Sequence, residues 1–430
     1  MLAGLFDIHK PGSTPFTCGD INDQHGYQLM EAFVWAMNYV NTKQGMFSGL
    51  LSGVKLGSLI FDTCSSEVRA GNLVANYHAR NFEIRTTDYR IDPSLIDLYI
   101  GPMTSESTVR VADVLQELGI PEIGYGASTL ELLDQRKYNY FIRTVPTDAK
   151  QARALISLLK KYEWNNVQVI SQNSSNGEFA REEFLRLAPL NKICVSAEFV
   201  VGQAGKINPA EARTVLDRLR NKPDATTVVV IMDDPTTLLM QADASDDIIN
   251  GGFAFITTDQ MGFGMNGYSN LNGIDRLVSR RRVLSLEVES ADYPEIDAFF
   301  EHAVPTEEMI QTNPWFKEYF EYIHNCSYAN PSLQYARVCN QYVQGYPRAE
   351  RFIQDPYSLY VVNAVFAAAI GIHKTVRQMC GNAPGICTIL LDHGEKREMF
   401  LHNIRQVTEA VCTLVSMKFN TFVMFLKIIL

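Results

Sequence analysis

The chain has 430 residues, of which 46% are hydrophobic and 20% are charged. This composition is typical of folded globular domains and excludes a disordered, collagen-like or membrane-bundle protein. Lys and Arg number 38 against 48 Asp and Glu, which gives a net charge of -10. Nucleic acid and anionic lipid surfaces are therefore disfavoured as partners, because both require a basic face. The length is sufficient for two or three domains with sizeable cores.

Apolar runs of strand length alternate with amphipathic stretches through the first two thirds of the chain, which predicts βαβ units and a mostly parallel sheet. The first series starts with a strand at 2–8 and closes one doubly wound domain. Its later elements are a strand at 54–62, a helix at 65–81, a strand at 95–101, a helix at 105–118 and a strand at 121–125.

A second series begins after Pro146 and predicts a second doubly wound domain. Its elements are a helix from Thr147 or Asp148 to about 162, strands at 167–171, 193–201, 226–232 and 253–258, and helices at 178–187, 210–221 and 235–244. From about 283 the pattern changes to one strand and then mainly helices, including a long apolar stretch at 357–380. This last segment is either an appended helical domain or a return to complete the first sheet.

Eight cysteines are too few for a disulfide scaffold, but six of them fall into pairs that could close loops. The pairs are Cys18 with Cys64, Cys326 with Cys339, and Cys380 with Cys387. On spacing alone, reduced core thiols and disulfides are equally supported. No stretch has the Cys-x-x-Cys or Cys/His spacing of a zinc site, so the spacing predicts no metal site.

Neither end of the sequence predicts a membrane anchor. The apolar run at 421–430 is shorter than the roughly 20 residues that span a bilayer. Met1 leads directly into the first strand without the regions of a signal peptide. We expect either a cytosolic protein or one whose leader is missing from this sequence.

Gly262, Gly264 and Gly267 form the G-x-G-x-x-G pattern of dinucleotide-binding loops. The residues after it are rich in turn formers and do not predict the helix N-terminus that would hold a pyrophosphate. A flexible loop is favoured over a cofactor site, and we predict no cofactor. Because no catalytic motif accompanies the loop, an enzyme with a nucleotide cofactor stays an alternative hypothesis only.

Two small polar turns, at 101–105 and 126–129, each follow a strand of the first predicted sheet. Backbone N–H groups and hydroxyls in such turns suit a carboxylate. A single turn of this kind is more often a helix cap than a site. With two of them in adjacent connections, an anion site is as well supported as two caps.

Several uncommon sequence blocks extend this pattern. They are AGLFDIH at 3–9, CGDI at 18–21, LGSLIFDTC at 56–64, YFIRTVPTDAKQARA at 140–154 and NPWF at 313–316. In these blocks, their order and their spacing, residues 1 to about 408 resemble the extracellular Venus-flytrap ligand-binding domain of the metabotropic glutamate receptors, which are class C G-protein-coupled receptors. The resemblance implies a two-lobe, periplasmic-binding-protein-like α/β fold in which each lobe is a doubly wound, mostly parallel sheet.

The resemblance also implies how the chain is divided. Lobe 1 is expected at 1–144 and 284–411, and lobe 2 at 145–283. The segment 412–430 matches nothing in the family and indicates a truncation or a gene-model error that would leave an edge of the lobe 2 sheet unpaired. An extracellular setting makes the three cysteine pairs disulfides. Cys194 matches a cysteine that in the family links this domain to a following cysteine-rich domain.

An amino-acid site is implied in the same way. Ser105 and Ser128, the second beside Gly126, match hydroxyl positions that bind an α-carboxylate, and both are expected on lobe 1. Asp148 and Asp259 match two acids that hold an α-ammonium, and both are expected on or near lobe 2. Asp148 can also be read as a helix cap, and Asp259 as the end of a strand.

Three positions depart from the family. Asn176 replaces a tyrosine over the ammonium, and Leu29 and Leu391 replace basic residues that would meet the distal carboxylate of glutamate. A buried carboxylate facing two leucines would lose charge-assisted hydrogen bonds, on the order of several kcal/mol. The expected ligand is therefore an α-amino acid other than glutamate, as in divergent invertebrate members. The alternative is a truncated, non-signalling structural partner of full-length receptors with a weak or vestigial site.

The resemblance implies further partners in a full-length receptor: a cysteine-rich domain, a seven-helix membrane domain and a G protein, at the extracellular face of the plasma membrane. The segment 80–93 has no cysteine, so a homodimer would be noncovalent. Its predicted surface is the helix at 107–118, whose residues Val111, Leu115 and Leu118 can equally be core. Asn173 begins a glycosylation sequon close to Asn176.

Overall fold

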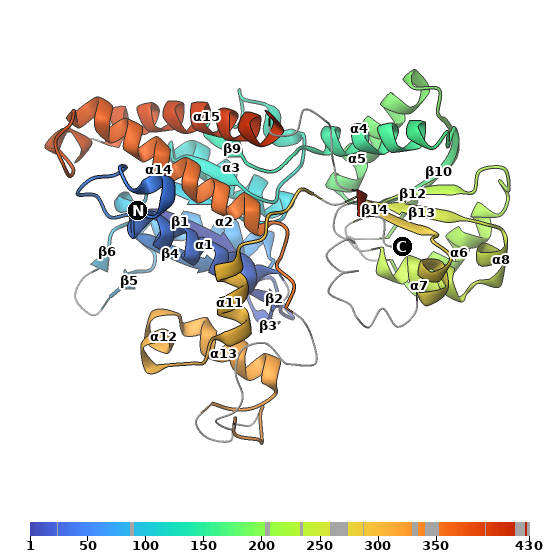
Figure 1. Ribbon diagram of the computed structural model, residues 1–430, viewed down its shortest axis with the longest axis horizontal. Helices are drawn as coiled ribbons and strands as arrows, with labels where there is room; N and C mark the ends of the chain where they lie inside the picture. The colour runs from blue at the N-terminus through green and yellow to red at the C-terminus, as the bar shows by residue number, and fades with distance from the viewer. Residues whose placement is uncertain are drawn as a thin grey trace. The chain divides into compact units, whose positions relative to one another are not determined.

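The computed structural model describes residues 1–23, 25–86, 90–202, 207–232, 235–258, 274–286, 288–328, 334–339, 352–391, 393–417 and 426–427 (Figure 1). The chain forms two compact units. Unit 1 comprises Met1–Ala127, Leu132–Val145 and Ser290–Asn420, and unit 2 comprises Ser128–Glu131, Pro146–Glu289 and Thr421–Leu430.

Unit 1 is built on a five-stranded parallel sheet in the order β4-β1-β7-β8-β9. Its strands are β1 (Leu2–Phe6), β4 (Ser58–Asp62), β7 (Leu98–Ile100), β8 (Glu122–Gly124) and β9 (Phe141–Arg143). The predicted strand at 54–62 is wrong in its first half. The backbone of Leu56 is bonded instead to the side-chain amide of Asn41, through both its N–H and its carbonyl. Those bonds replace pairing with a neighbouring strand.

Helices cover the unit 1 sheet. The longer ones are α1 (Gly26–Asn41), α2 (Glu67–His78), α3 (Ser105–Leu118), α14 (Ser358–Cys380) and α15 (His393–Met417). On α3, Val111 and Leu115 are buried in a core cluster with Val74 of α2. The core interpretation of these two residues, rather than a dimer surface, is therefore confirmed.

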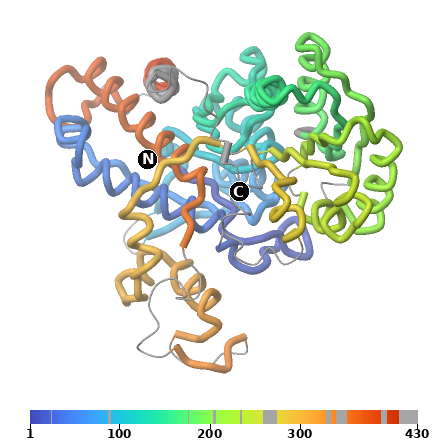
Figure 2. Tube along the Cα trace, turned by 45° about the vertical axis from the view of Figure 1, so that its right-hand side comes forward, coloured from blue at the N-terminus to red at the C-terminus, as the bar shows by residue number. Residues whose placement is uncertain are grey.

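The late helices belong to unit 1. Helix α14 packs against α1 and α15, and Figure 2 shows it beside the N-terminal segment. Ser358–Cys380 is, among the described helices, the one long and apolar enough to cross a membrane, but 61% of its most apolar window is buried inside the protein. That burial is typical of a core helix.

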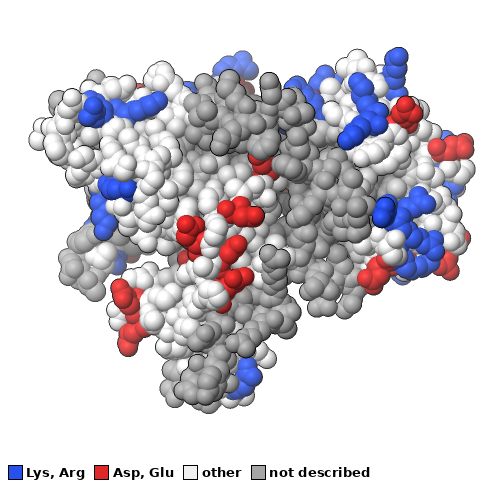
Figure 3. Space-filling view, viewed as in Figure 1, with Lys and Arg blue, Asp and Glu red and all other residues white. Residues whose placement is uncertain are grey.

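Smaller elements lie at the periphery of unit 1. They are the hairpins β2 (His9–Pro11) with β3 (Cys18–Ile21) and β5 (Ile84–Arg85) with β6 (Arg90–Ile91), the helices α11 (Pro294–His302), α12 (Glu307–Thr312) and α13 (Pro314–His324), and the short turns η1 (Gly45–Phe47), η2 (Pro93–Leu95) and η4 (Thr388–Leu391). Acidic side chains gather over α11 on the face shown in Figure 3. The three predicted disulfides, Cys18–Cys64, Cys326–Cys339 and Cys380–Cys387, are present.

Unit 2 repeats the architecture, with the sheet order β11-β10-β12-β13-β14-β15. Its strands are β10 (Asn166–Gln172), β11 (Cys194–Val201), β12 (Thr227–Ile231), β13 (Ala254–Thr257), β14 (Val283–Leu286) and β15 (Leu426–Lys427), and its helices are α4 (Asp148–Lys161), α5 (Ser175–Leu190), α6 (Pro209–Leu219), α7 (Thr236–Ala244), α8 (Asp246–Asn250) and α10 (Asp275–Ser279). Strand β15 pairs antiparallel with β14 through Leu426 and Lys427. The edge that was predicted to be unpaired therefore carries two residue pairs.

The central strand β12 shows why this sheet is covered on both faces. All five of its residues are buried. Val228 and Val230 belong to one core cluster, whereas Val229 and Ile231 belong to another. Successive side chains of a strand point to opposite faces, so a continuous apolar run requires helices on both sides of the sheet. The predicted α/β class, with two doubly wound and mostly parallel sheets, is confirmed.

Candidate functional site

The candidate site in unit 1 starts from the strand order. Numbered along the chain, the five strands lie in the order 2-1-3-4-5, so the direction of winding reverses between β1 and β7. Ligands of open α/β sheets bind outside the carboxyl ends of the strands at this switch point. The loop that follows β7 is the first predicted turn, and it leads into α3.

The two predicted turns are in contact with one another. Gly126, after β8, approaches the turn after β7 so closely that a Cβ at this position would lie 2.5 Å from the carbonyl oxygen of Met103. Gly101 has φ +92, and a Cβ there would lie 2.4 Å from the carbonyl oxygen of Leu5. Glycine at both positions allows the loops to lie backbone against backbone at the carboxyl edge of the sheet.

Ser105 is the first residue of α3, yet the cap of this helix is made by Thr104. The Thr104 hydroxyl accepts a hydrogen bond from the backbone N–H of Ser107 and donates one to the Ser107 hydroxyl at 2.9 Å. The Ser105 side chain is buried, with an exposed fraction of 4%, and its hydroxyl makes no hydrogen bond to another described residue. The geometry therefore separates the residue that caps the helix, Thr104, from Ser105, whose hydroxyl does not cap the helix.

This separation predicts different effects for two similar substitutions. Thr104→Ala should lower the free energy of unfolding by about 1 kcal/mol, because the helix loses its side-chain cap. Ser105→Ala should change it by less than about 0.5 kcal/mol, because no bond within the described protein is lost. Urea unfolding of both variants checks this. Equal losses would mean that Ser105 has a purely structural role.

Ser128 groups with unit 2, whereas it was expected on lobe 1. Its carbonyl oxygen accepts a hydrogen bond of 3.1 Å from the backbone N–H of Asp148. This bond ties the start of α4 to the turn after β8 and explains the grouping. The Ser128 side chain is half-buried, and Gly126 remains in unit 1.

Asp148 is the first residue inside α4 and is 4% exposed. The cap position itself is occupied by Thr147, whose side chain makes no cap hydrogen bond. A carboxylate in the first turn is stabilised by the positive end of the helix dipole. Asp148 is therefore not the cap of α4, which was its alternative interpretation.

The remaining predicted residues of unit 2 either follow strand β10 or lie outside the described residues. Asn176 is the second residue of α5, after the cap Ser174, which accepts a bond from the N–H of Gly177; its side chain lies outside the description. Asn173 is exposed, as a glycosylation site requires. Asp259, directly after the last described residue following β13, lies outside the described residues. So does the glycine-rich segment that contains Gly262, Gly264 and Gly267.

The two positions predicted for the distal pocket lie in unit 1. Leu29 is on α1 and is 1% exposed. Leu391 ends the short turn η4 (Thr388–Leu391), and its side chain lies outside the description. Leu29 thus lies buried on α1 and brings no charge to this position.

Sequence reasoning missed a charged group at the end of β4. His9 Nδ1 lies 2.5 Å from Asp62 Oδ2, and His9 Nε2 lies 3.1 Å from Glu318 Oε1 on α13. The hydrogen bond with Asp62, followed by the one with Glu318, raises the pKa of His9 to about 9, against a smaller opposing effect of burial. His9 is therefore protonated at neutral pH. Two of these residues lie in recognised sequence blocks, but nothing in the sequence pairs them with Glu318.

The comparison with protein families assigns the chain to a family of receptor domains. The model of the receptor family ligand binding region matches residues 28–415, which include most of α1, the two large sheets apart from β1 and β15, and most of α15. The chain belongs to this family. The receptor family ligand binding region is extracellular and binds ligands rather than catalysing reactions. Three disulfides fit an extracellular protein of this family.

Proposed function

We propose that the chain is the extracellular amino-acid-binding domain of a metabotropic glutamate receptor-like G-protein-coupled receptor, and that its ligand is an α-amino acid other than glutamate. The observation that carries this proposal is the position of Ser105, a buried residue whose hydroxyl does not cap its helix. It lies at the N-terminus of α3, in the connection at the switch point of the unit 1 sheet, and Thr104 already caps the helix. The first N–H groups of a helix have no intrahelical acceptor, and together with a hydroxyl they suit a carboxylate.

The proposed clamp for the ammonium group is acidic. Asp148 is buried at the start of α4, and Asp259 follows β13 in the sequence. A buried carboxylate and an ammonium group stabilise each other only when they are close and desolvated together. Ligand binding by lobe closure supplies this: a ligand that contacts both lobes only in the closed state shifts the population towards that state.

The proposed distal pocket is uncharged. Leu29 is an apolar residue buried on α1, and Leu391 is the second apolar residue at a position where the family has a basic one. A glutamate side chain would place its second carboxylate against these leucines without a cation, at a cost of several kcal/mol by order of magnitude. Neutral, apolar or cationic amino acids avoid this cost.

Thermal unfolding of the secreted domain against a panel of amino acids tests the proposal. A ligand that binds only the folded state raises the unfolding midpoint with concentration, corresponding to about 2.7 kcal/mol at 100 times its Kd. We expect a neutral or cationic amino acid to stabilise the domain and glutamate to have no effect. Ser105→Ala, Asp148→Asn and Asp259→Ala should each weaken this response.

Two substitutions on the same helices serve as controls. Asp113→Asn on α3 and Ser157→Ala on α4 alter exposed residues, so the response to the ligand should be unchanged. Stabilisation by glutamate would contradict the interpretation of Leu29 and Leu391. A folded domain that responds to no amino acid would contradict the proposal and favour a structural partner of full-length receptors.

A further inference from the structure

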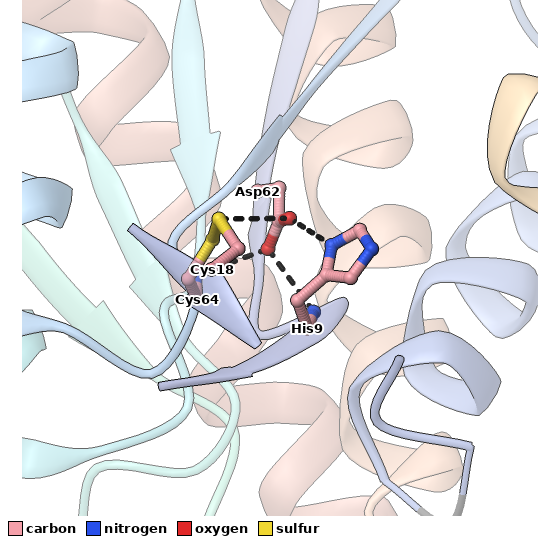
Figure 4. A group of neighbouring side chains, drawn as sticks. All are labelled: His9, Cys18, Asp62 and Cys64. Atoms are coloured by element: carbon pink, nitrogen blue, oxygen red, sulfur yellow. Dashed lines mark hydrogen bonds and ion pairs between the residues drawn. A yellow bond between two sulfur atoms is a disulfide. The ribbon is translucent and has the colours of Figure 1, made fainter. Parts of the chain in front are cut away.

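Four potential metal ligands converge at the carboxyl end of β4 (Figure 4). One ligand atom each from His9, Cys18, Asp62 and Cys64 lies within 4.8 Å of the other three. They come from two separate segments: His9 and Cys18 from the hairpin β2–β3, and Asp62 and Cys64 from the end of β4 and the two residues that follow it. In the structure, Cys18 and Cys64 form a disulfide. The separated origin of these ligands explains why sequence spacing predicted no metal site.

Hydrogen bonds and an ion pair already fix the orientation of two of these ligands, His9 and Asp62. His9 directs Nδ1 towards Asp62, while its other ring nitrogen, Nε2, is 3.1 Å from the carboxylate of Glu318. A carboxylate on the second nitrogen is the usual partner of a metal-bound histidine, because it fixes the ring and raises the basicity of the ligand. The Asp62 carboxylate is also oriented, since its Oδ1 accepts hydrogen bonds from the backbone N–H groups of Cys64 at 3.0 Å and His9 at 3.3 Å.

We propose that reduction of the Cys18–Cys64 disulfide opens a four-coordinate Zn²⁺ site made of the two thiolates, His9 Nδ1 and Asp62. Two sulfurs, one imidazole nitrogen and one carboxylate oxygen form a donor set that suits tetrahedral zinc. With Zn–S distances of about 2.3 Å and Zn–N and Zn–O distances of about 2.0 Å, tetrahedral ligand atoms lie roughly 3.3–3.8 Å apart. Atoms already within 4.8 Å need only small side-chain movements to reach these separations.

The chemistry balances with a dithiol as the reductant. The S–S bond of the protein breaks, the two sulfurs take two electrons and two protons, and the dithiol is oxidised to its own disulfide. Cys18 is the exposed partner, whereas Cys64 is fully buried, so an external thiolate reaches Cys18. When Zn²⁺ binds, it takes the place of both thiol protons and of the proton on His9 Nδ1, and these protons leave to solvent.

Zinc binding would replace the disulfide as the link between the same two segments of the chain. The disulfide joins the β2–β3 hairpin to the segment after β4. Zn²⁺ bound to His9, Cys18, Asp62 and Cys64 would join the same two segments through two ligands from each. The hairpin would thus stay fastened to the sheet edge under reducing conditions, provided that zinc is present.

The test uses the full chain reduced with dithiothreitol and desalted without oxygen, with Co²⁺ as the spectroscopic probe and Zn²⁺ as the competitor. We expect one Co²⁺ per reduced chain, with a thiolate-to-cobalt charge-transfer band and tetrahedral ligand-field bands that Zn²⁺ abolishes. The oxidised chain should show neither. Glu318→Gln should weaken Zn²⁺ affinity by about 10- to 100-fold.

Matched variants separate this site from the other cysteines. Cys18→Ser with Cys64→Ser should lose the charge-transfer band, whereas Cys326→Ser with Cys339→Ser, Cys380→Ser with Cys387→Ser, and Cys194→Ser should keep it. Asp62→Asn retains all the cysteines and should lose the tetrahedral bands. Survival of these signals in the Cys18 and Cys64 double variant, or equal binding by the oxidised chain, would overturn the proposal. Unchanged tetrahedral bands in Asp62→Asn would also overturn it, because they would indicate binding by thiols alone.

Discussion

Replacing Phe300 by alanine should lower the free energy of unfolding of unit 1 by about 3–5 kcal/mol, the range observed for removal of a large buried aromatic side chain. Phe300 is on α11 and is 2% exposed. Its ring stacks on Phe352 with centroids 4.4 Å apart, and it meets Tyr27 and Tyr319 edge to face. The substitution would leave a cavity where α11 packs against α1 and α13. Denaturant unfolding monitored by tyrosine fluorescence measures the loss.

Phe16 provides the matched control for this experiment. It lies in the turn between β2 and β3 and is 60% exposed, so Phe16→Ala should change stability by less than about 0.5 kcal/mol. A loss below about 1 kcal/mol for Phe300→Ala would mean that α11 can collapse onto its neighbours. In that case the aromatic cluster would not be the main contact of this helix.

The stability of unit 1 should fall as the pH rises from about 4.5 to 7 because of Glu31. Burial raises the pKa of this carboxyl from 4.5 to about 7, against the opposing effect of hydrogen bonds from Tyr27 and Asn313. The Tyr27 hydroxyl donates at 2.6 Å and the Asn313 amide at 2.5 Å. In this pH window the folded state binds more protons than the unfolded state, so stability is greatest below the unfolded pKa and is lost as the pH rises through the folded pKa.

Glu31→Gln isolates this contribution, because glutamine keeps an oxygen acceptor but does not ionise. Between pH 5 and pH 8, the free energy of unfolding of the natural chain should fall by about 2–3 kcal/mol more than that of the variant. Urea unfolding at a series of pH values measures both curves. Glu117→Gln alters an exposed residue of α3 and should leave the curve of the natural chain unchanged. Parallel curves for the natural chain and Glu31→Gln would show that Glu31 titrates normally.

Local sequence signals predicted most elements of the fold, and the errors have local causes. The helix predicted at 105–118 is observed as Ser105–Leu118, because the cap Thr104 and the left-handed Gly119 both mark its ends. The helix predicted at 178–187 starts three residues earlier, at Ser175, because the cap of Ser174 was overlooked. Apolar periodicity reports the buried face of a helix, but it does not fix where the helix begins.

The site was less accessible to sequence reasoning than the fold. The pattern of hydroxyls at 104–107 offers several equivalent candidates, and only the geometry shows that Thr104 caps the helix while the Ser105 hydroxyl remains available. The group formed by His9, Asp62 and Glu318 depends on α13 packing beside the β2–β3 hairpin. Such contacts between distant segments leave no periodic signal in the sequence. The pairing of cysteines by spacing likewise stayed open until the resemblance implied an oxidising compartment.

The division of the chain between the two units affects the order in which a ribosome could produce them. Unit 2 is formed almost entirely by one continuous segment, Pro146–Glu289, whereas unit 1 needs both ends of the chain. Helix α14 supplies the partner of α1 in the unit 1 core, so this core cannot close until most of the chain has been synthesised. Domains that consist of local segments fold early during synthesis, while contacts between distant segments form late. We therefore expect the apolar faces of the N-terminal strands and helices of unit 1 to stay exposed during translation until α14 has been synthesised.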